Sequence, residues 1–270
     1  MFSKPEVELL IKSNLLSIKF ESKKALRSKE ILLNNDIMDA GIIKDYQKLF
    51  DRLDILFSEV KNNAKIKVYY AGNYLISRYI KIDNLKKKEI QTYIDLQKEE
   101  LFPIDIRNYT IDYFYKDSQI HLYALDNQFI DNLYEYFITR EYRDIYLSPY
   151  DRKLNFNLKS AENICYISLD LNQINILNKK NNLIDYFDSF PLNSNVDLEL
   201  VYKELLDNNN STTISEESKA YLNSYLNSLE SLKNIINLDN TVYGGEFAKN
   251  NKIFEYIIER YKNWRLELNE

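Results

Sequence analysis

The chain has 270 residues, of which 45% are hydrophobic and 29% are charged, and its formal net charge is −5. This composition predicts a folded globular protein and excludes a disordered one, and the length suffices for one or two domains. The negative charge argues against nucleic acid as the main partner, because such binding depends on clustered lysine and arginine.

The numbers of cysteine and histidine residues and the lengths of the apolar runs further limit the class of protein. The single cysteine, Cys165, leaves no disulfide framework, which is typical of a reducing cytoplasm. One cysteine and one histidine also argue against a metal site built from these residue types. No run reaches the ~18 apolar residues of a membrane span, and the first residues lack the apolar core of a signal peptide. We therefore expect a cytoplasmic protein with no membrane-inserted segment in this chain.

The N-terminal part of the chain has the residue pattern of β-strands. Alternating apolar residues predict three consecutive strands, over residues 7–11, 15–21 and 25–33. An apolar stripe with a 3.6-residue period then predicts a helix over residues 43–60. Gly72-Asn73 tolerates positive φ, so we expect a hairpin in which strands 65–71 and 74–82 flank this dipeptide.

A helix and a second strand pair follow. Apolar periodicity predicts a helix over residues 84–101, and Pro103 forbids its continuation because proline has no N–H and restricts the residue before it. Alternation predicts strands over residues 109–116 and 119–125. A further amphipathic helix carries the apolar residues Phe129, Ile130, Leu133 and Phe137.

The second half of the chain repeats this order of strands and helices. Three more strands are predicted, over residues 164–170, 173–179 and 183–188. Helices are predicted over residues 198–206, 219–229 and 247–261. The polar stretch 207–218 is expected to be an exposed loop, and the apolar Ile235, Ile236 and Val242 lead into Gly244-Gly245. Two meanders, each followed by helices, indicate an architectural duplication.

The acidic helix that ends in Leu-Phe-Pro-Ile-Asp and runs into a strand with Ile-Asp-Tyr resembles the signature of the PilM family. These are actin-like cytoplasmic proteins of type IV pilus machines. The motif positions that match are Glu99, Pro103 and Asp112, and the signature is not a catalytic site.

The resemblance implies a two-lobed actin-like, ribonuclease H-like α/β fold with an inserted strand-helix-strand-strand module. We expect the first subdomain in residues 1–64 plus 148–162, the module in residues 65–147 and a reduced second subdomain in residues 163–270.

In the PilM and actin-like families, two D-x-G-[ST] hairpin turns and a later glycine pair surround ATP. The match of Ser17-Ile18-Lys19 to the family's Ser-Ile-Lys places Lys12 at the first aspartate, Asn14 at the glycine and Leu15 at the hydroxyl residue. Only Ser13 and Asn14 would then remain as nucleotide contacts of this turn. Lys12 is open to two interpretations, a compensating phosphate-binding cation or a solvent-facing hairpin lysine, and the second is favoured.

The second turn and the glycine pair are better preserved. Asp170 remains and would be the Mg²⁺ ligand of any bound Mg-ATP, while Asn172 replaces the glycine and tolerates its left-handed geometry. Gly244 and Gly245 stand where the family's glycine pair belongs, although a helix N-terminal turn would explain them equally well. Charge-assisted contacts are worth about 1.5–3 kcal/mol each, so we expect weak or absent ATP binding, no hydrolysis and no required cofactor.

Other candidate residues have simpler interpretations. Glu99, Glu100 and Asp105 are expected at a solvated helix end and not in an acid–base pair. Asp112 is expected to make a structural hydrogen bond, and His121 is expected to pack in or on a sheet.

The resemblance implies a cytoplasmic adaptor on the inner-membrane assembly platform. It implies that the cytoplasmic segment of a PilN-like membrane protein binds in a groove between residues 7–60 and 65–147, near the platform and motor ATPase components. An ATP-dependent switch in the same machine is the alternative. A type II secretion protein of the GspL type, a fusion that continues into a membrane span, and a relative of FtsA are further possibilities. FtsA is disfavoured because no terminal amphipathic membrane helix is visible.

Overall fold

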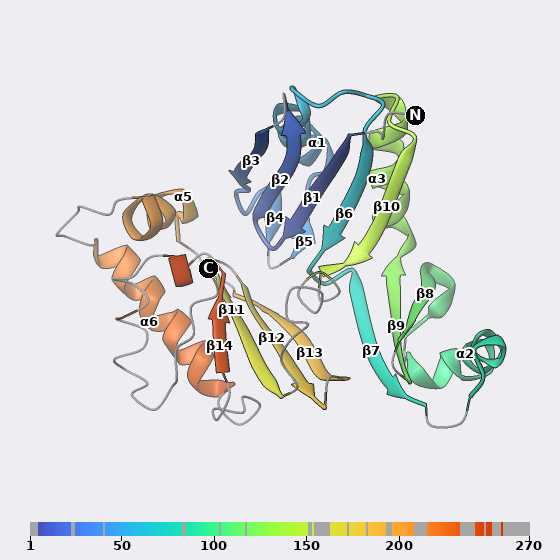
Figure 1. Cartoon of the computed structure of the whole chain (residues 1–270). Helices are drawn as coiled ribbons and strands as arrows, with labels where there is room; N and C mark the ends of the chain where they lie inside the picture. Colours follow the sequence, from blue (N-terminus) through green and yellow to red (C-terminus); the bar gives the residue numbers. More distant parts are fainter. Residues whose placement is uncertain are drawn as a thin grey trace.

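The computed structural model describes residues 5–22, 25–39, 41–82, 85–102, 104–116, 118–150, 153, 163–171, 173–181, 183–192, 196–207, 215–232, 241–245, 247–249 and 255. These residues form two lobes, each built on its own sheet, and a smaller module that extends from the first lobe (Figure 1). The architecture is mixed α/β, as the sequence predicts.

The first lobe is a five-stranded sheet in the order β10-β6-β1-β2-β3. Its strands are β1 (Glu6–Lys12), β2 (Leu15–Ser22), β3 (Ala25–Leu32), β6 (Lys65–Tyr70) and β10 (Asp144–Pro149). The predicted meander of β1, β2 and β3 is confirmed, because each of these strands pairs antiparallel with the next one along the chain. The short strands β4 (Met38–Asp39) and β5 (Ile42–Ile43) pair with each other.

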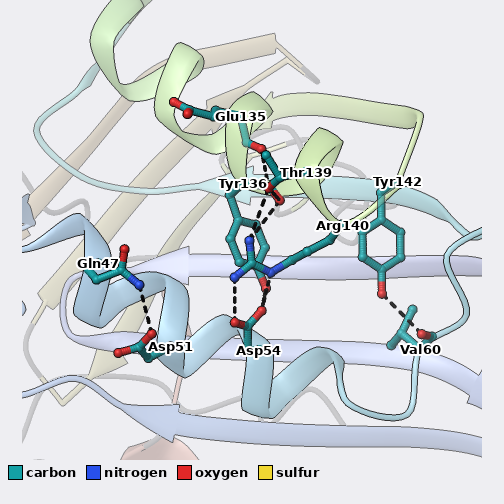
Figure 2. A network of polar contacts seen from close by, with 9 residues as sticks. All are labelled: Gln47, Asp51, Asp54, Val60, Glu135, Tyr136, Thr139, Arg140 and Tyr142. Carbon is teal, nitrogen blue, oxygen red and sulfur yellow. Dashed lines mark hydrogen bonds and ion pairs between the residues drawn. The ribbon is translucent and has the colours of Figure 1, made fainter.

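Two helices cover the first lobe, α1 (Tyr46–Phe57) and α3 (Asn127–Thr139). Figure 2 shows how they are tied together. Asp54 of α1 accepts hydrogen bonds from Tyr136 Oη at 3.0 Å and from Arg140 Nη2 at 2.6 Å. The Arg140 guanidinium also lies 4.0 Å from the centroid of the Tyr136 ring. This clamp holds the two helices side by side over a shared apolar core.

The hairpin predicted around Gly72-Asn73 is wrong. Strand β6 lies between β1 and β10 and pairs with both in parallel, whereas β7 (Leu75–Lys81) pairs with β9 (Gln119–Asp126) in another sheet. The dipeptide therefore connects two sheets. Gly72 is needed there because a Cβ would lie 2.3 Å from the hydroxyl of Tyr70.

The module has the predicted strand-helix-strand-strand order, formed by β7, α2 (Ile90–Leu101), β8 (Tyr109–Lys116) and β9. Its sheet order is β7-β9-β8, and α2 packs on one face through apolar contacts. Because β6, α3 and β10 lie with the first lobe, we propose that the module spans residues 75–126, narrower than the expected 65–147. The first subdomain then includes residues beyond the expected 1–64 plus 148–162.

The second lobe contains a four-stranded sheet in the order β13-β12-β11-β14. Its strands are β11 (Ile164–Asp170), β12 (Gln173–Lys180), β13 (Leu183–Pro191) and β14 (Thr241–Gly244). The predicted meander of β11, β12 and β13 is confirmed. Strands β10 and β14 were not predicted, and β14 pairs with β11 in parallel. The outer bounds of this subdomain, expected at residues 163–270, stay a prediction.

Helices of the second lobe pack on one side of its sheet (Figure 1). They are α5 (Leu198–Tyr202), a π-helical turn (Lys203–Asp207), α6 (Glu216–Ser231) and a 3₁₀ turn (Phe247–Lys249). The predicted loop 207–218 is too long at both ends, because helical structure reaches Asp207 and resumes at Glu216. Ile235, Ile236 and most of the predicted helix 247–261 lie outside the described residues.

Candidate functional site

Two hairpin turns, one from each lobe, meet in the cleft between the lobes. The β1–β2 turn carries Lys12, and β11 ends at Asp170. Lys12 Nζ lies 2.8 Å from Asp170 Oδ1, and the exposed fractions of the two side chains are only 7% and 3%. The cleft is thus closed at this point by an ion pair of the protein's own residues.

Asp170 has further partners inside its own lobe. Its Oδ2 accepts hydrogen bonds from Ser168 Oγ at 2.8 Å and from Asn175 Nδ2 at 3.0 Å. Both carboxylate oxygens are therefore engaged, one by the ammonium of the other lobe and one by neighbouring strands. A buried charge of this kind is tolerated only when it is paired and hydrogen-bonded.

The favoured interpretation of Lys12, a solvent-facing hairpin lysine, is wrong. Its ammonium is buried against Asp170 and lies 5.2 Å from the centroid of the Tyr150 ring. Lys12, the residue aligned with the first aspartate by the resemblance, therefore places a positive charge beside Asp170. The resulting pair needs no external cation for charge balance.

The backbone of the first turn is also engaged across the cleft. Ser13 N–H donates to Gln173 Oε1 at 3.1 Å. Gln173 Nε2 donates in turn to Asn175 Oδ1, which also accepts from Ser189 Oγ at 2.6 Å. Amide N–H groups in this turn would be the donors for a phosphate, and that of Ser13 is occupied by the second lobe.

Asn14 keeps the left-handed geometry that a glycine would supply, with φ of 64°. Its side-chain amide fixes this conformation by donating to the backbone oxygens of Leu33 at 3.1 Å and Met38 at 2.6 Å, and to Asn35 Oδ1 at 3.0 Å. The turn survives, and its amide is committed to the first lobe. Asn172, the corresponding residue of the second turn, lies outside the described residues.

The glycine pair packs closely on β11. Gly245 has φ of +93°, and a Cβ there would lie 2.5 Å from the backbone oxygen of Leu169. At Gly244 a Cβ would lie 2.0 Å from the hydroxyl of Tyr166. Burial raises the pKa of Tyr166, so this phenol stays neutral above the glycine pair. Packing alone accounts for both glycines.

A small cavity lies beside the ion pair, between described residues of the two lobes. Its volume is about 190 Å³, and its lining includes Lys12, Lys19, Tyr150, Asp170 and Gly245. Sites for drug-sized ligands usually measure about 300–1,000 Å³. The residues in this arrangement do not fit Mg-ATP, because the space is small and the candidate metal ligand is paired with a lysine. Within the described part of the chain, no group of three or more His, Cys, Asp or Glu is placed to hold a metal.

The two signature residues that the structure describes, Glu99 and Asp112, lie on the module and do not join the cleft. Glu99 is exposed on α2, and Pro103 lies outside the described residues. Asp112 accepts a hydrogen bond from Tyr123 Oη at 2.8 Å, which confirms its expected structural role. His121 stacks on Tyr79 with ring centroids 4.4 Å apart, so its expected packing role is also confirmed.

Three cleft residues were missed by sequence analysis, namely Ser168, Gln173 and Asn175. A signal for them exists in the sequence. Ser168 and Asp170 are two positions apart on β11, as are Gln173 and Asn175 on β12, and all four are buried. Polar residues with a period of two on one face of an otherwise apolar hairpin indicate a buried polar network.

Comparison with known proteins identifies the fold of the chain through solved structures and not through sequence. No protein-family model matches it, and no curated protein matches it. A structure of the PilM–PilN type IV pilus biogenesis complex matches with a TM-score of 0.58 and 12% identity, over 97% of this chain and 90% of that chain. A protein of unknown function with an actin-like ATPase fold from Bacteroides thetaiotaomicron matches with a TM-score of 0.53 and 10% identity, over 98% and 91%.

The cytoplasmic domain of EpsL, an inner membrane component of the type II secretion system of Vibrio cholerae, matches with a TM-score of 0.48 and 8% identity, over 79% of this chain and 78% of that chain. The fold of the present chain is actin-like, as expected. None of the helices described here has both the length and the apolar character to cross a membrane.

Proposed function

We propose that this chain is a protein-binding scaffold of a type IV pilus or type II secretion assembly platform, and that its cleft does not work as an ATP site. The buried Lys12–Asp170 ion pair is the main observation against an ATP site in the cleft. Breaking a buried ion pair costs about 3–5 kcal/mol. A nucleotide that must separate this pair would lose about two to four orders of magnitude in affinity.

The partner we propose is the cytoplasmic segment of a PilN-like inner-membrane protein. The likeness in fold to the PilM–PilN structure and the retained module with its Asp112 contact support this choice. We place the segment between the core of the first lobe and the module, at the cytoplasmic side of the inner membrane. Through this attachment the chain would contact the platform and motor ATPase components of the machine.

A direct binding experiment tests the scaffold. The full chain is titrated with the cytoplasmic segment of a PilN-like protein from the same genome, and isothermal titration calorimetry measures the affinity. We expect saturable binding with the same affinity in the presence and absence of Mg-ATP. A scrambled segment of equal composition is the matched control. No association, or binding that is equal for the scrambled segment, would refute the scaffold.

The ATP-dependent switch is a second candidate, favoured by the position of Asp170 and Gly245 at one cavity. A ligand at 100 times its Kd stabilises the folded state by about 2.7 kcal/mol, which is easily seen in a melting curve. We expect no change in Tm at millimolar Mg-ATP. A rise of several degrees that Mg²⁺ alone does not produce would favour the switch and overturn the proposal about the cleft.

A further inference from the structure

A second groove lies between the module and the second lobe, away from the ion pair. Its volume is about 430 Å³, and it is lined by residues of β7 and β13 and by Gly72-Asn73. Strand β7 is the edge of the module sheet, and β13 is the edge of the second-lobe sheet. The two edges approach each other at the centre of the molecule (Figure 1). The groove therefore has a strand edge on each side.

The direction of the β7 backbone follows from its pairing with β9. Asp126 N–H donates to Tyr74 O at 3.0 Å, and Ile82 N–H donates to Ser118 O at 2.9 Å. In an antiparallel ladder every second residue points its N–H and C=O at the partner strand. Even-numbered residues of β7 therefore face β9, and the N–H and C=O of Ser77 point to the open edge. Arg78 Nη1 donates to this C=O at 2.9 Å from an exposed side chain.

The edge of β13 already takes strand-like hydrogen bonds from the module. Gln119 Nε2 donates to Ile184 O at 2.6 Å, and Ile184 N–H donates to Gln119 Oε1 at 3.1 Å. A residue of an adjacent strand would make the same two bonds. The outward backbone groups of β13 are thus within reach of a partner on the module side, and Gln119 marks one end of the region where the two edges meet.

The charges that line the groove favour a basic partner. Asp185 and Asp188 are both exposed, and Arg78 is the one lysine or arginine among the described lining residues. Arg78 is already directed at the backbone of its own strand. A ligand with a basic side chain would find two carboxylates beside the open edge of β7, whereas an acidic ligand would meet repulsion.

We propose that this groove binds an extended segment of a partner protein, which adds as a strand to β7 at Ser77 and places a lysine or arginine beside Asp185 and Asp188. Main-chain hydrogen bonds would supply affinity, and the two aspartates would supply selectivity. The part of β7 that lines the groove, Leu75–Tyr79, is five residues long and can pair with a strand of similar length. This groove lies between the module and the second lobe, whereas the site in the proposed function lies between the module and the first lobe, and the inference does not depend on that function.

A displayed library of random peptides, selected on the intact chain, tests the proposal. We expect the enriched peptides to alternate β-branched or aromatic residues with polar ones and to carry a basic residue. Ser77→Pro removes the outward N–H without removing a bond to β9, so it should abolish binding of these peptides. Ser77→Ala is the matched control, because it keeps the N–H and should bind as the parent does. Asp185→Asn with Asp188→Asn should weaken binding about tenfold, in line with a lost charge pair.

Hydrogen exchange on the unmodified chain provides a measurement that does not depend on a variant that folds. A bound peptide should slow exchange at the Ser77 amide, while the even-numbered amides of β7, already paired with β9, should change little. The proposal is overturned if no peptide is enriched, if the enriched peptides bind Ser77→Pro as tightly as the parent chain, or if the Ser77 amide gains no protection.

Discussion

Lys12 and Asp170 join the two lobes through one buried contact of 2.8 Å between Nζ and Oδ1. The two residues come from the corresponding hairpins of the duplicated halves. The resemblance to the PilM family implies that a metal and a nucleotide would lie between those hairpins. In this protein the ammonium of Lys12 pairs directly with the carboxylate of Asp170, so an ion pair between two of its own side chains connects the lobes.

The first prediction concerns this pair. Lys12→Ala should destabilise the protein by about 3–5 kcal/mol, because the Asp170 carboxylate is left buried without its cation. Lys12→Met combined with Asp170→Leu should cost much less than the sum of the single changes. Urea unfolding measures both. Lys153→Ala is the control, since its pair with Glu8 is more exposed and should contribute less than about 1 kcal/mol. Additive single and double changes would contradict a coupled pair.

The second prediction separates the two roles of Asn14. Asn14→Ala loses both the tolerance for φ of 64° and the side-chain hydrogen bonds, whereas Asn14→Gly loses only the hydrogen bonds. Left-handed geometry costs a residue with a Cβ about 1–2 kcal/mol. We therefore expect the glycine variant to be more stable than the alanine variant by about 1 kcal/mol, and less stable than the parent, in chemical denaturation. A glycine variant as stable as the parent would show that the amide contacts contribute nothing.

The third prediction isolates close backbone packing at Gly245. Gly245→Ala and Gly41→Ala both place a Cβ at positive φ, with φ of +93° and +78°. The nearest atoms to that Cβ are 2.5 Å away at Gly245 and 3.3 Å away at Gly41. Thermal melting should therefore show a larger loss for Gly245→Ala, by more than about 1 kcal/mol, since backbone of β11 must shift to relieve the clash. Equal losses would mean that only the dihedral angle matters.

The fourth prediction is a pH dependence at the clamp between α1 and α3. Hydrogen bonds from Arg140 lower the pKa of Asp54, so the carboxylate stabilises the fold above the pKa of the unfolded chain, about 3.9. This stabilisation is lost as the pH falls through the lower pKa of the folded state. Asp54→Asn should cost less than about 1 kcal/mol at pH 7, because the pair is partly exposed, and still less at pH 3.

Urea unfolding at the two pH values checks the difference. In an Arg140→Met background the effect of Asp54→Asn should lose most of its pH dependence, because the main cause of the pKa shift is gone. A cost of Asp54→Asn that is the same at pH 7 and pH 3 would contradict the assignment.

Sequence patterns predicted the local parts of this fold and missed its non-local pairings. Both meanders were predictable, because alternation reports the two faces of a strand and successive strands of a meander pair with their neighbours. The error at β6 has a different origin. Its alternation is equally compatible with a hairpin partner at β7 and with parallel partners at β1 and β10, and only the tertiary structure decides.

The sequence allowed the location of the candidate site to be predicted, but not the ion pair that forms there. The turns that carry Asn14 and Asp170 were identified, and the left-handed geometry of Asn14 follows from the amide side chain. The burial of Lys12 could not be predicted, because its counter-ion is supplied by the other half of the chain. A lysine in a hairpin turn is usually solvated, and only the apposition of the two lobes makes this one an exception.

The hydrogen bond from Asp126 N–H to Tyr74 O has a consequence for how such a molecule could arise. The chain enters and leaves the module at two adjacent points, so a single site in the first lobe connects the module to the rest of the chain. An ancestral gene could gain or lose this block through a single insertion or deletion without a break in the sheet that supports it. The surface of the module could then change in evolution while the two larger sheets stayed the same.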